Sequence, residues 1–160
     1  MDIRVGKIVE VGPTPGSEHL YSEKIDIGGE IRDIGSGLRE HVTLDEMKDK
    51  LVIVLCNLPP RSLAKGAIIS HGMVLCGQTN DKSKVELLIP PEGSQPGDVI
   101  TFSGFERKPP AELPKKKSAW ETVAPKLVVD ANGVACYDNI PFTTDKGVVT
   151  SKTVRSGIVG

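Results

Sequence analysis

Aromatic residues, paired cysteines and long apolar runs are scarce in this sequence, and each scarcity excludes a class of protein. Of 160 residues, 4% are aromatic and three are cysteines. The longest apolar run, 51–56, is far shorter than the roughly 20 residues that a membrane-spanning helix needs. No membrane partner is therefore predicted. The first residues also lack the apolar core of a secretory signal, so we expect a cytoplasmic protein.

Metal and redox sites are not supported by the cysteines and histidines. Cys56, Cys76 and Cys136 are too far apart in the chain to form a paired-thiol motif or a zinc knuckle. The three histidines are equally scattered, and no His-Glu-x-x-His motif occurs. We expect reduced, buried thiols and no metal.

Motifs for catalysis are also missing. Residues 34–37 read Ile-Gly-Ser-Gly, which is neither a nucleophile elbow nor a dinucleotide-binding glycine motif, and a turn explains them better. No Gly-Lys-Ser/Thr phosphate loop occurs. The sequence therefore predicts a domain without catalytic residues and without a cofactor.

Net charge is close to zero, which argues mildly against nucleic acid because nucleic-acid-binding domains are usually basic. The chain has 20 Lys and Arg against 21 Asp and Glu, a net charge of −1. Counted along the sequence, the balance is −4 over residues 1–60 (7 basic, 11 acidic), +3 over 61–117 (9 and 6) and 0 over 118–160 (4 and 4). The positive excess is thus concentrated in the middle of the chain.

What the sequence does contain is a series of short β-rich stretches. Residues 3–11 alternate apolar and polar side chains, as a half-buried strand does. Residues 21–27 and 31–34 form a predicted hairpin around Gly28-Gly29. A short helix is predicted over 43–49, because Thr43 and Glu46 have the spacing of a capping box.

The later strands complete a recognisable order. Residues 51–56 are apolar without alternation, which predicts a strand buried on both faces. Further strands are predicted over 68–76, 85–89 and 99–102. Three strands, a short helix and more strands is the order of the OB-fold, so the predicted fold class is all-β, an OB-fold barrel with one short helix.

A change in composition follows this barrel. Residues 106–114 contain three prolines, which disfavour both helix and central strand, and a short helix is predicted over 118–123. The remaining stretches, 127–129, 134–137 and 147–150, predict short strands that are too few for a core of their own. We therefore expect an OB-fold domain over residues 1–105 and a small β-rich extension over residues 106–160 packed on the barrel.

The segment 57–66, expected as a loop after the buried strand, offers Asn, Ser, Arg and Lys side chains. Such donors suit phosphates and 2′-hydroxyls, although a solvated loop has the same composition. Six aromatics without a stripe disfavour capture of single strands by base stacking. Recognition of the shape of a folded RNA is the more compatible mode.

An ordered series of motifs carries a resemblance that composition does not. The motifs are DIRVGKI at 2–8, LYSEKIDIG at 20–28, SGL at 36–38, LCNL at 55–58, SHGMVLC at 70–76 and PPEGSQPGD at 90–98. Together they resemble the tRNA-binding domain family. The downstream PKKKSAWE at 114–121 is similar to the branch of that family typified by endothelial monocyte-activating polypeptide II.

The resemblance implies a module that binds the elbow of tRNA with little regard to the anticodon. It would act in cis or in trans as an affinity cofactor of an aminoacyl-tRNA synthetase, attached to its catalytic domain or to a multi-synthetase complex. The extension would imitate the dimer interface of bacterial relatives, which implies a monomer.

The resemblance also implies where RNA would be contacted. Pro59 stands where the family usually has a lysine, so Arg61 or Lys65 would supply the missing charge. The implied tRNA-binding residues are Arg4, Lys7, Asn57, Arg61, Lys65, Ser70, Met73, Lys115, Lys116 and Lys117.

A second hypothesis is a protein-interaction or cytokine-like signalling module. It rests on residues 4–10, which resemble a stretch linked to that activity in mammalian members of the branch. The alternative is that residues 4–10 are an ordinary first β-strand, which already explains their alternation of apolar and polar side chains.

Overall fold

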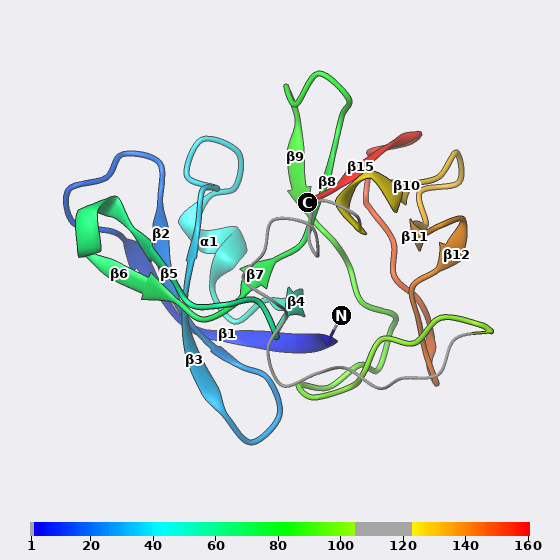
Figure 1. The fold of residues 1–160 in the computed structure, drawn as a ribbon, viewed down its shortest axis with the longest axis horizontal. Helices are drawn as coiled ribbons and strands as arrows, with labels where there is room; N and C mark the ends of the chain where they lie inside the picture. Colours follow the sequence, from blue (N-terminus) through cyan, green and yellow to red (C-terminus); the bar gives the residue numbers. More distant parts are fainter. Residues whose placement is uncertain (1, 105–122) are drawn as a thin grey trace.

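The computed structural model describes residues 2–104 and 123–160, which form an all-β protein with one short α-helix (Figure 1). The helix is α1 (Leu44–Met47), and single 3-10 turns cover Ala64–Gly66 and Ala124–Lys126. The strands are β1 (Ile3–Pro13), β2 (Tyr21–Asp26), β3 (Ile31–Ser36), β4 (Leu51–Leu55), β5 (Arg61–Leu63), β6 (Ile68–Ser70), β7 (Met73–Val74), β8 (Cys76–Gln78), β9 (Val85–Leu87), β10 (Leu127–Val129), β11 (Ala135–Tyr137), β12 (Ile140–Pro141), β13 (Thr143–Thr144), β14 (Gly147–Val148) and β15 (Gly157–Val159).

The first sheet is a barrel-like wall of five antiparallel strands in the order β3-β2-β1-β4-β7. The chain turns between β2 and β3 through Gly28 and Gly29, which both have positive φ, as a tight hairpin requires. Helix α1 lies between β3 and β4 in the chain, and Thr43 Oγ1 accepts the Glu46 N–H at 3.2 Å as its cap. The prediction of an OB-fold with one short helix is confirmed.

Strand β4 is buried on both faces, as its unbroken apolar run predicts. Ile53 and Leu55 pack into one hydrophobic cluster, while Val52 and Val54 face the other, and all four are 0% exposed. β4 therefore separates two cores. The core that contains Val52 and Val54 fills the barrel, and the core that contains Ile53 and Leu55 lies between the barrel and the extension.

The extension shares both a sheet and a core with the barrel. The second sheet has the order β12-β11-β10-β15-β8-β9, in which β15 pairs with β8 through Ile158↔Gln78. Leu127 and Phe142 belong to the same apolar cluster as Ile53. Figure 1 shows β10, β11 and β12 on one side of the molecule, with β8, β9 and β15 between them and the barrel. The boundary at residue 105 and the helix at 118–123 fall at or within residues 105–122, outside the described residues, and stay predictions.

Two predictions of single strands are wrong. Residues 68–76 form β6, β7 and β8. The chain leaves the hairpin that β6 forms with β5 at His71-Gly72, and it changes sheets at Leu75. The Leu75 N–H donates to the Ile53 carbonyl at 2.8 Å, which pins that crossing point. Residues 99–102 make isolated bridges, Arg4↔Val99 and Thr101↔Thr143, rather than a strand.

Two predictions of turns or loops are also wrong. Residues 34–36 end β3, where a Cβ on Gly35 would lie 2.8 Å from Leu63 Cδ1, so that the Leu63 side chain of the β5–β6 hairpin would have to shift. Residues 61–70, expected to begin as loop, form the β5–β6 hairpin, with Arg61↔Ser70 and Leu63↔Ile68 as partners. Its turn uses positive φ at Ala64, Lys65 and Gly66, and two of these residue types carry no turn signal.

Candidate functional site

A groove of about 870 Å³ opens between the β5–β6 hairpin, the segment after β3, β7 and the β8–β9 hairpin. Arg61, Ser70 and Met73, three of the residues that the resemblance implies, line this groove. They reach it from β5, β6 and β7. The fold therefore gathers side chains that are up to twelve positions apart in the sequence on one concave surface.

The electrostatics of the groove favour an anion. Its lining includes the basic side chains Arg61 and Lys82 and the imidazole of His41. Within the part of the chain that the structure describes, no Asp or Glu side chain lines it. A concave surface lined by charges of one sign raises the local concentration of oppositely charged groups. Phosphates of a nucleic acid fit this requirement.

The β5–β6 hairpin presents its basic side chains to solvent. Arg61 and Lys65 are both exposed, but only Arg61 lines the groove, since Lys65 lies at the hairpin turn. Ser70 has a positioning role: it is 4% exposed, and its Oγ accepts the Gly35 N–H at 3.0 Å and donates to the Gly72 carbonyl at 2.9 Å. Ser70 therefore fixes the hairpin against β3.

Other residues implied by the resemblance lie elsewhere. Asn57 is 2% exposed, and its Oδ1 accepts the Asp2 N–H at 2.9 Å, so it joins the end of β4 to the start of β1. Arg4 donates to both Asp2 carboxylate oxygens, at 3.0 and 2.9 Å, and these hydrogen bonds raise the pKa of Arg4. Neither these two nor Lys7 of β1 lines the groove.

Lys115, Lys116 and Lys117 lie outside the described residues, so their role stays a prediction. Residues 4–10, which carry the signalling hypothesis, belong to β1 and lie between β2 and β4. Val5, Gly6 and Ile8 in this stretch are buried, so three of its seven residues are not available as a surface motif.

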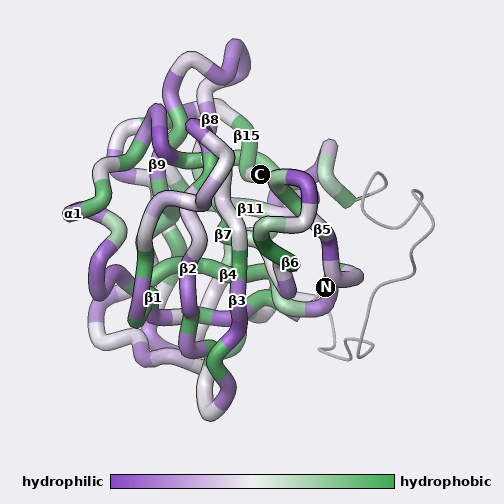
Figure 2. Tube along the Cα trace, turned by 90° about the vertical axis from the view of Figure 1, so that its left-hand side faces the viewer, coloured by the Kyte–Doolittle hydropathy of each residue, from purple (hydrophilic) through white to green (hydrophobic). Residues whose placement is uncertain are grey.

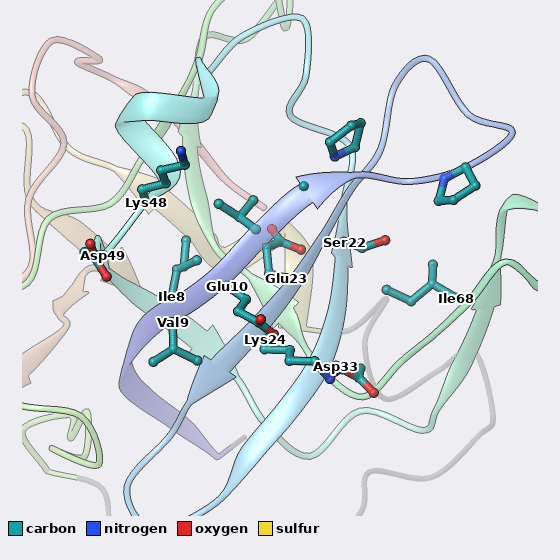
Figure 3. A pocket seen from close by; sticks show the side chains of 14 residues that line it. Ile8, Val9, Glu10, Ser22, Glu23, Lys24, Asp33, Lys48, Asp49 and Ile68 are labelled. Atoms are coloured by element: carbon teal, nitrogen blue, oxygen red, sulfur yellow. Dashed lines mark hydrogen bonds and ion pairs between the residues drawn. The ribbon is translucent and has the colours of Figure 1, made fainter.

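A second hollow of about 550 Å³ lies against β1 and β2 (Figure 3). Its charged side chains are of both signs, and Lys24 forms an ion pair with Asp33 at 2.9 Å, as Figure 3 shows. Glu10 and Asp49 also line it, whereas Lys48 is its second cation. Because acidic groups offset the cations, this hollow is a poorer phosphate site than the groove.

Glu23 of β2 is a buried acid that lines the second hollow and interacts with Ser36 and Cys76, two residues that line the groove. Glu23 is 2% exposed, and burial raises the pKa of its carboxyl to about 8, although the hydroxyl of Ser36 opposes this shift. Burial and the charge of Glu23 raise the pKa of the Cys76 thiol to about 12. At neutral pH both groups are therefore protonated. Glu23 therefore adds no negative charge next to the groove at neutral pH, and Cys76 is not a nucleophile.

Sequence reasoning missed His41 and Lys82. His41 follows β3 and is sixteen positions from Asn57, the implied residue nearest to it, while Lys82 lies at the tip of the β8–β9 hairpin, nine positions from Met73. The turn-rich run Thr79–Lys84 predicts a hairpin, but only the barrel places that hairpin beside the groove.

The described residues contain no group of three or more His, Cys, Asp or Glu side chains that could hold a metal ion. The three cysteines are buried and reduced, as expected. Neither the short α1 nor any other helix in the described ranges is long and apolar enough to cross a membrane.

A small β-barrel with a groove that carries Arg61 and Lys82 fits the class of nucleic-acid-binding modules. The particular family follows from comparison with known proteins: residues 3–99 match the family described as "Putative tRNA binding domain", and the chain belongs to that family. Membership confirms the resemblance to the tRNA-binding domain family and the prediction of a binding domain rather than a catalyst.

Relatives extend the match beyond residue 99. The chain is 44% identical over 160 residues to the cytoplasmic methionine–tRNA ligase of Arabidopsis thaliana. It is 43% identical over 161 residues to the aminoacyl tRNA synthase complex-interacting multifunctional protein 1 of Cricetulus griseus. These matches cover 99% of this chain, but only 20% and 44% of the two relatives.

A solved structure resembles the whole chain. The C-terminal domain of Plasmodium vivax p43 has a TM-score of 0.89 and 35% identity, and the match covers 99% of this chain and 96% of that one. The extension is thus part of a fold that the p43 domain also has.

Proposed function

We propose that this chain binds tRNA in the groove and acts as an affinity module for an aminoacyl-tRNA synthetase, in cis or in trans. The observation that carries the proposal is the groove itself, lined by Arg61, Lys82 and His41 without an acidic side chain among the described residues. Most of its lining belongs to the segment that matches the tRNA-binding family. The absence of an aromatic stripe favours backbone and shape recognition over base stacking.

The partners and compartment follow from the relatives. One relative is a cytoplasmic methionine–tRNA ligase and another is a protein of a synthetase complex, so the proposed partners are tRNA and a synthetase, in the cytoplasm. We also propose a monomer, because β15 already pairs with the edge of β8 that a second copy would otherwise need. Sedimentation equilibrium of the chain tests this, and a dimer would refute it.

Substitution at the β5–β6 hairpin tests the proposed site. Arg61→Ala should weaken binding to every tRNA species about equally and several-fold, because a phosphate contact carries no sequence information. The slope of log K against log salt should fall by about 0.9 per lost contact. Lys65→Ala should act in the same direction but less, since Lys65 lies outside the groove but in the turn of the hairpin that carries Arg61.

Lys152→Ala is the matched control, since Lys152 is exposed in the extension and does not line the groove. Titrations of several tRNAs with the full chain provide the measurement. If Arg61→Ala matches the control, or weakens one tRNA species alone, the assignment of this groove is wrong.

A further inference from the structure

The groove has a second wall, formed by the β8–β9 hairpin. Lys82 at the tip of this hairpin lines the same groove as Arg61 of the β5–β6 hairpin. Figure 1 shows the two hairpins as separate projections, and in Figure 2 the tip of the β8–β9 hairpin is hydrophilic. Two cations from two hairpins thus face one concave surface.

The tip that carries Lys82 is held in one conformation. Asp81 Oδ1 accepts hydrogen bonds from Thr79 Oγ1 at 2.7 Å and from Ser83 N and Oγ at 3.0 and 2.8 Å. The Ser83 N–H and these hydroxyls lower the pKa of Asp81 to about 2, so the carboxylate stays ionised and directed into the turn. Lys82 has a φ of 60°, a left-handed conformation that a non-glycine residue adopts only where its surroundings impose it.

The extension braces this hairpin. Asn80 Nδ2 donates to the Ser156 carbonyl at 3.0 Å, and Gln78 of β8 pairs with Ile158 of β15. Gln78 Nε2 also donates to the Gly160 carbonyl at 3.2 Å. Every one of these contacts joins the base or tip of the hairpin to the last five residues of the chain.

We infer that Lys82 contacts an RNA phosphate across the groove from Arg61, and that the C-terminal extension positions Lys82 for this contact. The inference rests on the proposed function, because it takes tRNA as the ligand of the groove. It assigns the extension a part in RNA binding in addition to covering the edge of the barrel. Asn80 is then a positioning residue, which acts on RNA only through Lys82.

The first test compares two lysines of the same hairpin. Lys84 is exposed like Lys82 but does not line the groove, so Lys84→Ala is the matched control. In the full chain, Lys82→Ala should weaken tRNA binding several-fold and reduce the salt slope by about 0.9. Lys84→Ala should change neither quantity appreciably. Equal effects of the two variants would overturn the assignment of Lys82.

The second test asks whether the brace acts through Lys82. Asn80→Ala removes the bond to Ser156 and no charge, so it should weaken tRNA binding in the parent chain. In the Lys82→Ala background it should have no further effect, which a double-mutant cycle measures. An undiminished effect in that background would refute positioning by the extension.

Arg61→Ala separates these outcomes from a failure of the proposed function. If the parent chain binds tRNA and Arg61→Ala weakens that binding while Lys82→Ala does not, only the inferred contact of Lys82 with RNA is wrong. If the parent chain shows no saturable binding of tRNA, the proposed function itself is wrong. Thermal unfolding of each variant confirms that the fold is retained.

Discussion

The carboxyl group of Glu23 is buried in the wall of the second hollow, beside the hydroxyl of Ser36. Among the described residues, no group makes a well-formed hydrogen bond with either Glu23 oxygen. The pKa of about 8 keeps this acid protonated at neutral pH. A single buried acid therefore makes the stability of the barrel depend on pH between about 4.5 and about 8.

The sign of that sensitivity follows from linkage. The pKa of Glu23 is about 8 in the folded chain, against an ordinary value of 4.5. Between these values the unfolded chain releases a proton that the folded chain keeps, so the free energy of unfolding falls as pH rises. Glu23→Gln should remove this fall, a difference on the order of 3 kcal/mol between pH 5 and pH 8. Urea unfolding at both pH values measures it, and parallel curves for parent and variant would contradict the account.

Residues of the site differ in how far the sequence reveals them. Ser70 and Met73 lie within the motif at 70–76 and Arg61 lies between two motifs, and the fold brings all three to one surface. Asn57 is a polar residue after a strand, which looks the same in the sequence whether it meets RNA or, as here, the Asp2 backbone. Lys82 was not predicted because its approach to Arg61 depends on the barrel and not on spacing.

At the scale of elements, Glu86 of β9 fastens the loop before β15. Its carboxylate accepts hydrogen bonds from Ser151 Oγ at 2.5 Å, from Thr153 N and Oγ1 at 2.7 and 2.9 Å and from Val154 N at 2.8 Å. Desolvation opposes ionisation, but these bonds outweigh it and lower the pKa of Glu86 to about 2. The last strand is therefore held on the barrel by a charged contact as well as by the ladder.

The stabilisation from Glu86 has the opposite pH dependence from that of Glu23. A folded pKa of about 2, below the ordinary 4.5, gives stability that is present above pH 4.5 and lost as pH falls toward 2. Glu86→Gln should cost about 1–2 kcal/mol at pH 7, since the carboxylate is partly exposed, and almost nothing at pH 2. Denaturant unfolding at both pH values is the measurement. A cost that persists unchanged at pH 2 would show that the charge is not responsible.

Elements with regular patterns were predictable, and those defined by tertiary contacts were not. The alternation in β1, the Gly28-Gly29 turn and the Thr43 cap are local signals, and each is present in the structure. Residues 57–66 are expected as a loop and 68–76 as a strand, so the prediction misses β5 and the turn of the hairpin, where Ala64 and Lys65 take positive φ without being turn residues.

At the scale of the whole molecule, the barrel and the extension form one unit through the shared sheet and the shared core. An ion pair of Lys146 with Asp98 at 2.6 Å adds a further link between them. The net charge of −1 says little about binding, because the basic side chains of the groove face one concave surface and the acids lie elsewhere. A module of this kind is expected to bind tRNA locally and modestly.

The most direct measurement is the affinity of the full chain for tRNA and for an unrelated RNA duplex of similar size, by filter binding at about 50 mM and about 200 mM salt. The account predicts tighter binding of tRNA at both salt concentrations, an affinity that falls with salt, and a several-fold loss for Arg61→Ala. Equal affinities for the two RNAs, or an affinity for tRNA that neither salt nor Arg61→Ala changes, would contradict it.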